Sequence, residues 1–237
     1  MDASLQELLR TLLQSGSESN PALNALISDY STYHLVLVMV GGLFLVALII
    51  LSVFLWRRFS RAPRTDTRRW TFEKRVYFVF GLLSVLVGLA MTVIVAANVS
   101  TAVHPREGFA GSISMLGTPQ PGTPSADVQG SVYAWLESGS PDTPADLQAQ
   151  IDERLSWQRP KAIVCGVLLV VFVFLSFLIW RALIRRSRDR TARWGFPGVG
   201  LFVLGVITVL ASLLLMLMVM GNTQGSLAPI SLTLFLG

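Results

Sequence analysis

The chain has 237 residues, of which 52% are hydrophobic and 14% are charged, and its mean hydropathy is +0.59. Soluble domains carry about 25% charged residues, so this composition excludes an ordinary soluble protein and predicts an integral membrane protein. The net charge of +5 comes from 19 Lys and Arg against 14 Asp and Glu, and the distribution of these charges along the chain bears on topology.

Residues 1–32 precede the first long apolar run and sum to a charge of −3. The segment starts MDASLQELL, with acidic residues where a signal peptide has basic ones, so we expect no cleaved signal. Its leucines are spaced to form one face of a short amphipathic helix, and a similar face recurs near residue 130. The two faces are Leu5, Leu8, Leu9, Leu12 and Leu13, and Val128, Val132, Trp135 and Leu136. We expect such helices to cover the ends of the membrane helices, to lie on the outer leaflet or to dock on another protein.

Four apolar runs are long enough to cross about 30 Å of hydrocarbon at a rise of about 1.5 Å per residue. They lie at residues 33–56, 76–97, 162–180 and 199–220. We therefore predict an all-α integral membrane protein with four transmembrane helices and short extracytoplasmic amphipathic helices.

Most of the Lys and Arg residues are concentrated in two short loops. Residues 57–75 carry eight basic and two acidic side chains, and residues 181–194 carry six and one, so these loops hold 14 of the 19 Lys and Arg. Short Arg-rich loops stay in the cytoplasm, so both termini and the 98–160 segment are predicted to be extracytoplasmic. Four tryptophans lie at the inner helix ends, as expected for a headgroup layer: Trp56, Trp70, Trp180 and Trp194. Seventeen Arg against two Lys suggest a GC-rich bacterial genome, and hence a bacterial cytoplasmic membrane.

The arginines of these loops have two interpretations. They set the topology, and they are also candidates for binding anionic lipid headgroups or an acidic partner. The candidates are Arg57, Arg61, Arg64, Arg181, Arg185 and Arg188.

The two halves of the sequence resemble each other. Shifting the chain by 124 positions aligns residues 33–98 with residues 157–222 without a gap, and 22 of the 66 positions are identical. We therefore predict a tandem duplication whose copies are related by a pseudo-twofold axis along the membrane normal. The first repeat covers residues 1–98 and the second covers residues 126–222. An irregular extracytoplasmic linker at 99–125 joins them. A tail at 223–237 follows, which is too short to span and is expected to be an outer strand, a re-entrant piece or a segment packed on a partner.

The returning helix of each repeat carries small residues at spacings of three and four, which place them on one helix face. Such faces let helix backbones approach closely in lipid, so they predict packing of the second span on the fourth or on a partner helix. A small polar lining for a permeation path is the alternative. The residues are Gly81, Ser84 and Gly88 in the first repeat and Gly205, Thr208 and Ser212 in the second.

Residues that would carry chemistry are scarce. Ionisable side chains are absent from the interior of the four runs, the histidines are only two, Cys165 is the single cysteine, and no catalytic motif is recognisable. We expect no enzyme, no cofactor, no metal and no nucleic-acid partner. The sequence instead favours an accessory or scaffolding subunit that binds another membrane protein. A small transporter or channel, or a protein that handles anionic lipids, are the alternatives.

Overall fold

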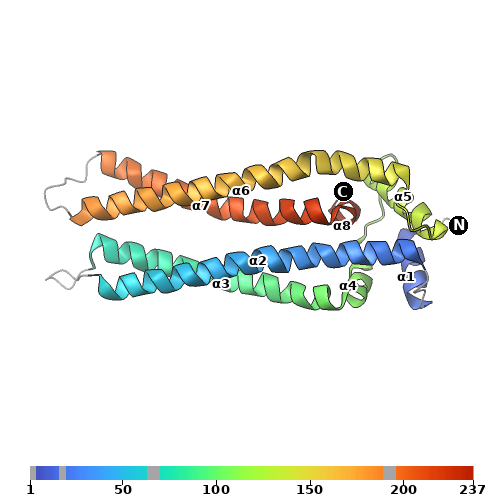
Figure 1. Cartoon of the computed structure of the whole chain (residues 1–237), viewed down its shortest axis with the longest axis horizontal. Helices are drawn as coiled ribbons and strands as arrows, with labels where there is room; N and C mark the ends of the chain where they lie inside the picture. The colour runs from blue at the N-terminus through green and yellow to red at the C-terminus, as the bar shows by residue number, and fades with distance from the viewer. Residues whose placement is uncertain (1–3, 16–19, 63–69, 189–195, 237) are drawn as a thin grey trace. The chain divides into compact units, whose positions relative to one another are not determined.

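The computed structural model describes residues 4–15, 20–62, 70–188 and 196–236, and its regular elements over these ranges are helices (Figure 1). They are α1 (Leu5–Gln14), α2 (Pro21–Arg61), α3 (Phe72–Val103), α4 (Pro105–Ser112), a 3₁₀ turn η1 (Ile113–Met115), α5 (Pro124–Ser138), α6 (Ala145–Arg188), α7 (Phe196–Leu227) and α8 (Pro229–Leu236). The all-helical expectation is confirmed for these ranges.

Four of these helices, α2, α3, α6 and α7, are long and apolar enough to cross a membrane, and each contains one of the predicted runs. Helices α2 and α6 have 41 and 44 residues, about 60 Å or more of helix, which is twice the thickness of the hydrocarbon layer. Both helices therefore begin well before their predicted runs, which start at residues 33 and 162. No Gly or Pro lies between residues 22 and 33 of α2, and α6 continues through Pro160 just before its predicted run.

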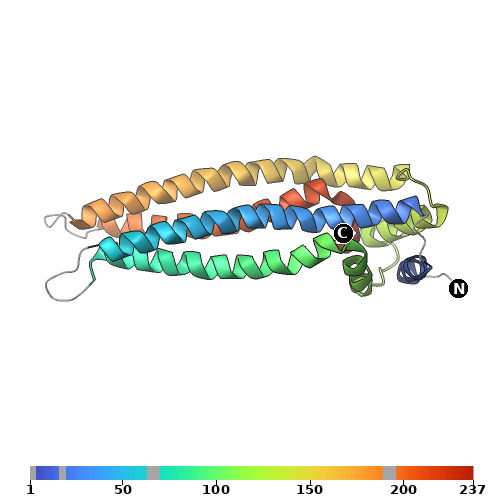
Figure 2. The same ribbon diagram turned by 60° about the horizontal axis from the view of Figure 1, so that its bottom comes forward.

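The helix bounds recur at the offset that aligns the two halves of the sequence. Helix α6 begins 124 residues after α2, while α7 and α8 repeat both bounds of α3 and α4 at the same interval. Figure 2 shows α2 running beside α3, and α6 beside α7.

The chain divides into two compact units, each drawn from both halves of the sequence. Unit 1 comprises residues 1–39, 95–162 and 220–237, and unit 2 comprises residues 40–94 and 163–219.

Unit 1 has a hydrophobic core into which both amphipathic helices insert their apolar faces. Leu9, Val132 and Trp135 are fully buried, and Leu8, Leu12 and Leu13 pack around them. Helix α1 packs on α5 and η1, and α5 packs on α8. Burying one such large apolar side chain contributes about 1.5–3 kcal/mol. The predicted apolar faces are thus used within unit 1, where they cover the ends of the long helices.

Helix ends in unit 1 are capped by the residue types that the sequence places there. Ser4 and Thr123 accept hydrogen bonds from the backbone N–H groups of Glu7 and Ala126, each at 3.3 Å. Gly139 ends α5 in the left-handed conformation, with φ of 62°, which glycine adopts without strain. The side chain of Asn20 caps α2 at Leu23 and also donates to the carbonyl of Leu136, at 2.9 Å.

The linker and the tail are more regular than we expected. Helix α3 extends to Val103, α4 and η1 follow, and the tail contains the end of α7 and all of α8. Pro105 and Pro229 begin the two short helices, a position where the missing N–H costs nothing. Phe109, Ile113 and Leu234 are buried in the core. The expectation of an irregular linker at 99–125 was wrong for residues 99–115, where burial overrides the weak helix propensity of the Gly and Ser residues, whereas residues 116–123 have no helical structure.

Two tertiary contacts in unit 1 recur at the same offset. The hydroxyl of Tyr30 donates to the carbonyl of Gly108 at 3.2 Å, and the guanidinium of Arg154 donates to the carbonyl of Leu232 at 3.2 Å. The first bond joins the fourth residue of α4 to α2, and the second joins the fourth residue of α8 to α6. Different side chains therefore make the same connection at equivalent positions.

The closest packing of the short helices also recurs, with large and small residues exchanged. A Cβ atom added to Gly108 would meet the side chain of Thr101, and one added to Gly225 would meet the side chain of Leu232. Residues 101 and 225 are equivalent at the offset of 124, as are residues 108 and 232. In the first contact the larger residue, Thr101, lies on the long helix α3 and the glycine on α4. In the second contact the larger residue, Leu232, lies on the short helix α8 and the glycine on α7. Each contact therefore has one side chain in the space between the two helices.

Candidate functional site

The small residues predicted to mediate helix packing lie in unit 2, where two of them face tryptophans. A Cβ atom added to Gly81 would lie 3.3 Å from Cε2 and 3.3 Å from Nε1 of Trp56. The same atoms of Trp180 would lie 3.1 Å and 3.2 Å from a Cβ atom on Gly205. The indole N–H of Trp180 also donates to the Gly205 carbonyl at 3.3 Å. Each glycine thus lets the returning helix pack flat against an indole ring of the preceding helix.

The remaining small residues of the two stripes lie beside these glycines. Ser84 and Thr208 are buried, and a Cβ atom added to Gly88 would lie 4.0 Å from Leu45 of α2. The three hydroxyls donate to carbonyls of their own helix, from Ser84 to Phe80 at 2.8 Å, from Thr208 to Gly205 at 2.9 Å and from Ser212 to Thr208 at 2.7 Å. At all three glycines, the neighbour that the structure places there belongs to the preceding helix of the same hairpin.

Aromatic rings extend these two joints. Trp56 lies 5.9 Å from Phe78, and Trp180 lies 5.7 Å from Phe202, in edge-to-face pairs at equivalent positions. Phe80 of α3 contacts Trp180 of α6 at 4.7 Å between ring centroids. Such pairs contribute about 0.5–1.5 kcal/mol beyond the area that they bury. Helix α3 is therefore held by aromatic contacts to both α2 and α6.

At the charged end of unit 2, the carboxylate of Glu73 is buried. Glu73 is only 6% exposed, and the guanidinium of Arg188 binds it in a bidentate ion pair at 2.9 Å and 2.5 Å. The next residue, Lys74, is also buried and donates to the carbonyl of Ala62 at 3.3 Å. Sequence reasoning identified Arg188 and missed Glu73 and Lys74, because their charges were counted only as part of an exposed loop.

The other candidate arginines differ from Arg188 in their surroundings. Arg57, Arg61, Arg181 and Arg185 are exposed, and Arg64 lies outside the described residues. Arg57 and Arg61 lie one turn apart on α2 and line a shallow pocket of about 390 Å³ together with Ser52, Trp56 and Ser60. The pocket combines two cations with an amphipathic ring, a composition suited to the headgroup layer.

Two glycines of the first and third spans face open space. A Cβ atom added to Gly42 or Gly166 would have no neighbour within 4 Å. These positions are equivalent at the offset of 124. They differ from Gly81 and Gly205 because no described side chain occupies the space before them.

Side chains that could bind a metal ion are spread over the fold. In the described part of the chain, no three His, Cys, Asp or Glu side chains lie close enough together to bind a metal ion, and Cys165 is buried and forms no disulfide. No protein-family model, curated protein or solved structure matches this chain.

Proposed function

We propose that the chain is a tandem duplication of a two-helix hairpin, with copies related by a pseudo-twofold axis along the membrane normal. Three observations support this: the 22 identities in 66 aligned positions, the recurrence of helix bounds at an offset of 124, and the equivalent joints at Trp56 and Trp180. Independent convergence of two segments on an apolar composition would not produce these three observations together.

The proposed orientation places both Arg-rich loops in the cytoplasm and both termini outside. The charge asymmetry of the loops supports it. On the opposite end of the spans, Trp157 is 44% exposed and Lys161 lies over its ring at 4.1 Å, a pairing suited to the outer headgroup layer. Trp157 and Trp180 are 23 residues apart, about 35 Å of helix, close to one bilayer. The Arg-rich composition favours a bacterial cytoplasmic membrane.

We further propose that the protein is a non-catalytic accessory or scaffolding subunit that binds a partner membrane protein. The observation that carries this proposal is the exposure of α6. Only 6% of its most apolar 18-residue window is buried within the chain, against 22% for α3 and α7. The small-residue faces of α3 and α7 contact their own hairpins at the glycines, so the partner helix is proposed to pack on α6 around Gly166.

The test is purification from the native membrane in mild detergent, with the partner identified and its ratio to this chain measured. Gly166→Leu is expected to release the partner while the melting temperature of the purified chain stays unchanged. Gly200→Leu is the matched control, because Gly200 lies on α7 and a Cβ atom there also meets open space. If no partner co-purifies in fixed ratio, and the pure protein supports flux in liposomes, the scaffold proposal fails in favour of the channel.

A further inference from the structure

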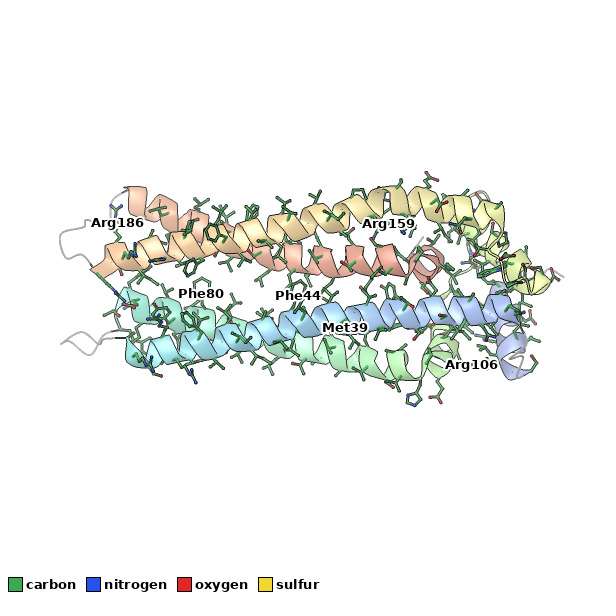
Figure 3. The ribbon with its side chains drawn as sticks, in the orientation of Figure 1. Met39, Phe44, Phe80, Arg106, Arg159 and Arg186 are labelled. Carbon is green, nitrogen blue, oxygen red and sulfur yellow. The ribbon has the colours of Figure 1, made fainter. Side chains whose placement is uncertain are left out.

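A groove in unit 2 is bounded by α3, α6 and α7. It has a volume of about 410 Å³, within the range of about 300–1,000 Å³ that is usual for small-molecule sites. Its wall is almost wholly apolar: Val76, Val79 and Leu83 come from α3, and Val206, Val209 and Leu210 come from α7. Figure 3 shows Phe80 on the side of α3 turned toward α6 and α7.

The groove has the length of one leaflet. On α3 it runs from Phe72 to Leu83, about 17 Å at 1.5 Å per residue, whereas half of the hydrocarbon layer is about 15 Å. One end lies at the start of α3, next to the Arg-rich loop, and the other lies near the middle of the span. A lipid chain that enters from the cytoplasmic leaflet would therefore fill it from end to end.

Among the described residues that line the groove, Arg75 is the cation at the headgroup end. Glu73, Lys74 and Arg75 are consecutive, but the first two are buried and engage Arg188 and the Ala62 carbonyl. Arg75 is exposed, lines the groove and forms no ion pair with any residue that the structure describes. Its guanidinium can therefore bind an anion at the end of the apolar groove, where Trp180 also lines the wall.

The corresponding position in the second half of the chain lacks this charge. The equivalent of Arg75 is Val199, whereas Trp180 and Phe202 have the aromatic equivalents Trp56 and Phe78. The indole of Trp56 is in turn surrounded by Phe59 and Phe78. The groove beside α3 therefore has a cation at its end, whereas the equivalent position on α7 has the apolar Val199.

We propose that this groove binds one anionic phospholipid of the cytoplasmic leaflet, with an acyl chain between α3 and α7 and the phosphate against Arg75. The occupant follows from the groove's length, its apolar wall and the unneutralised guanidinium at its mouth. A neutral lipid would satisfy the wall but not the cation. The inference takes its leaflet from the proposed orientation and is independent of any partner protein.

The test is native mass spectrometry of the purified chain in detergent with added phosphatidylglycerol or phosphatidylcholine of the same acyl chains. One phosphatidylglycerol per chain is expected to be retained in preference to phosphatidylcholine. Arg75→Gln should weaken retention about fivefold, which corresponds to about 1 kcal/mol for one basic residue at an anionic surface. Arg58→Gln, an exposed arginine that does not line this groove, is the charge control.

A second pair of variants separates binding in the groove from general attraction to the Arg-rich end. Val79→Trp is expected to fill the groove and abolish retention, whereas Val203→Trp, at the equivalent exposed position of α7, leaves it unchanged. Both valines are exposed, 56% and 50%, so both variants are expected to fold, which circular dichroism checks. The proposal would be overturned if the chain retained the two lipids equally. It would also be overturned if Arg75→Gln and Arg58→Gln lost phosphatidylglycerol to the same extent, or if Val79→Trp and Val203→Trp did.

Discussion

The carboxylate of Asp29 in α2 accepts a hydrogen bond from the backbone N–H of Ser231, the third residue of α8, at 2.6 Å. The first N–H groups of a helix have no partner within it, so Asp29 caps α8 from a helix 202 residues away in sequence. Burial raises the pKa of this carboxyl above its ordinary value of 3.8, although the hydrogen bonds from α8 lower it. Asp29 lies four residues before the first predicted membrane-crossing run.

The cap predicts opposite effects for two substitutions of Asp29. Asp29→Asn keeps an acceptor oxygen without a buried charge, so the free energy of unfolding should be unchanged or slightly higher at neutral pH. Asp29→Ala leaves the N–H of Ser231 without its acceptor and should lower stability by about 1 kcal/mol. Thermal unfolding of both variants in detergent measures this. Equal destabilisation by Asn and Ala would contradict it.

The same carboxyl predicts a dependence of stability on pH. Because its pKa is raised in the folded state, the folded form binds more protons than the unfolded form between pH 3.8 and the raised value. Its contribution to stability therefore falls as the pH rises through that window. The melting temperature of the wild type should decline relative to that of Asp29→Asn over this range. If the melting temperatures of the two proteins change equally with pH, the raised pKa does not belong to Asp29.

The exchanged packing of the short helices predicts a rescue. Gly108→Leu should destabilise unit 1 by roughly 1–3 kcal/mol, because the new side chain overlaps Thr101. Adding Thr101→Gly recreates the arrangement of Gly225 and Leu232 and should restore part of the loss. Gly111→Leu, on the same helix and facing open space, is the control and should change stability by less than about 0.5 kcal/mol. Additive losses in the double variant would argue against equivalence of the two contacts.

The ion pair between Glu73 and Arg188 predicts coupling between α3 and α6. The Arg188 side chain is 63% exposed and that of Glu73 is 7% exposed, so solvent screens the pair and we expect a coupling energy of only about 1 kcal/mol. A double-mutant cycle with Glu73→Gln and Arg188→Gln measures it through thermal unfolding. Arg185→Gln, an exposed neighbour, serves as the reference variant and should show no coupling to Glu73→Gln.

The orientation predicts which cysteines react in intact cells. In a Cys165→Ser background, the cysteine of Arg58→Cys should not react with a membrane-impermeant maleimide, whereas the cysteine of Ser114→Cys should react with it. Both native side chains are exposed, so burial would not explain a difference. Permeabilised cells should label both positions, and labelling of position 58 from outside would reverse the proposed topology.

Local patterns in the sequence account for the parts of the fold that were predicted. Hydropathy located the four long helices, and periodicity identified the faces of α1 and α5 that insert at Leu9 and Trp135. The partner of each face was not predictable in this way. Spacing places Gly81 and Ser84 on one side of α3, but only the fold brings Trp56 against Gly81. Likewise, the pairing of Glu73 with Arg188 joins residues 115 positions apart, beyond the reach of any local signal.

The packing of α8 into unit 1 also sets an order of assembly. Leu234 and the residues around Asp29 belong to one core, yet translation at about 5–20 residues per second separates them by roughly 10–40 seconds. During that interval Tyr30 and Phe109 lack the ring of Phe235, and the N-terminal end of the core is incomplete. Helix α8 must therefore be synthesised before this core can close.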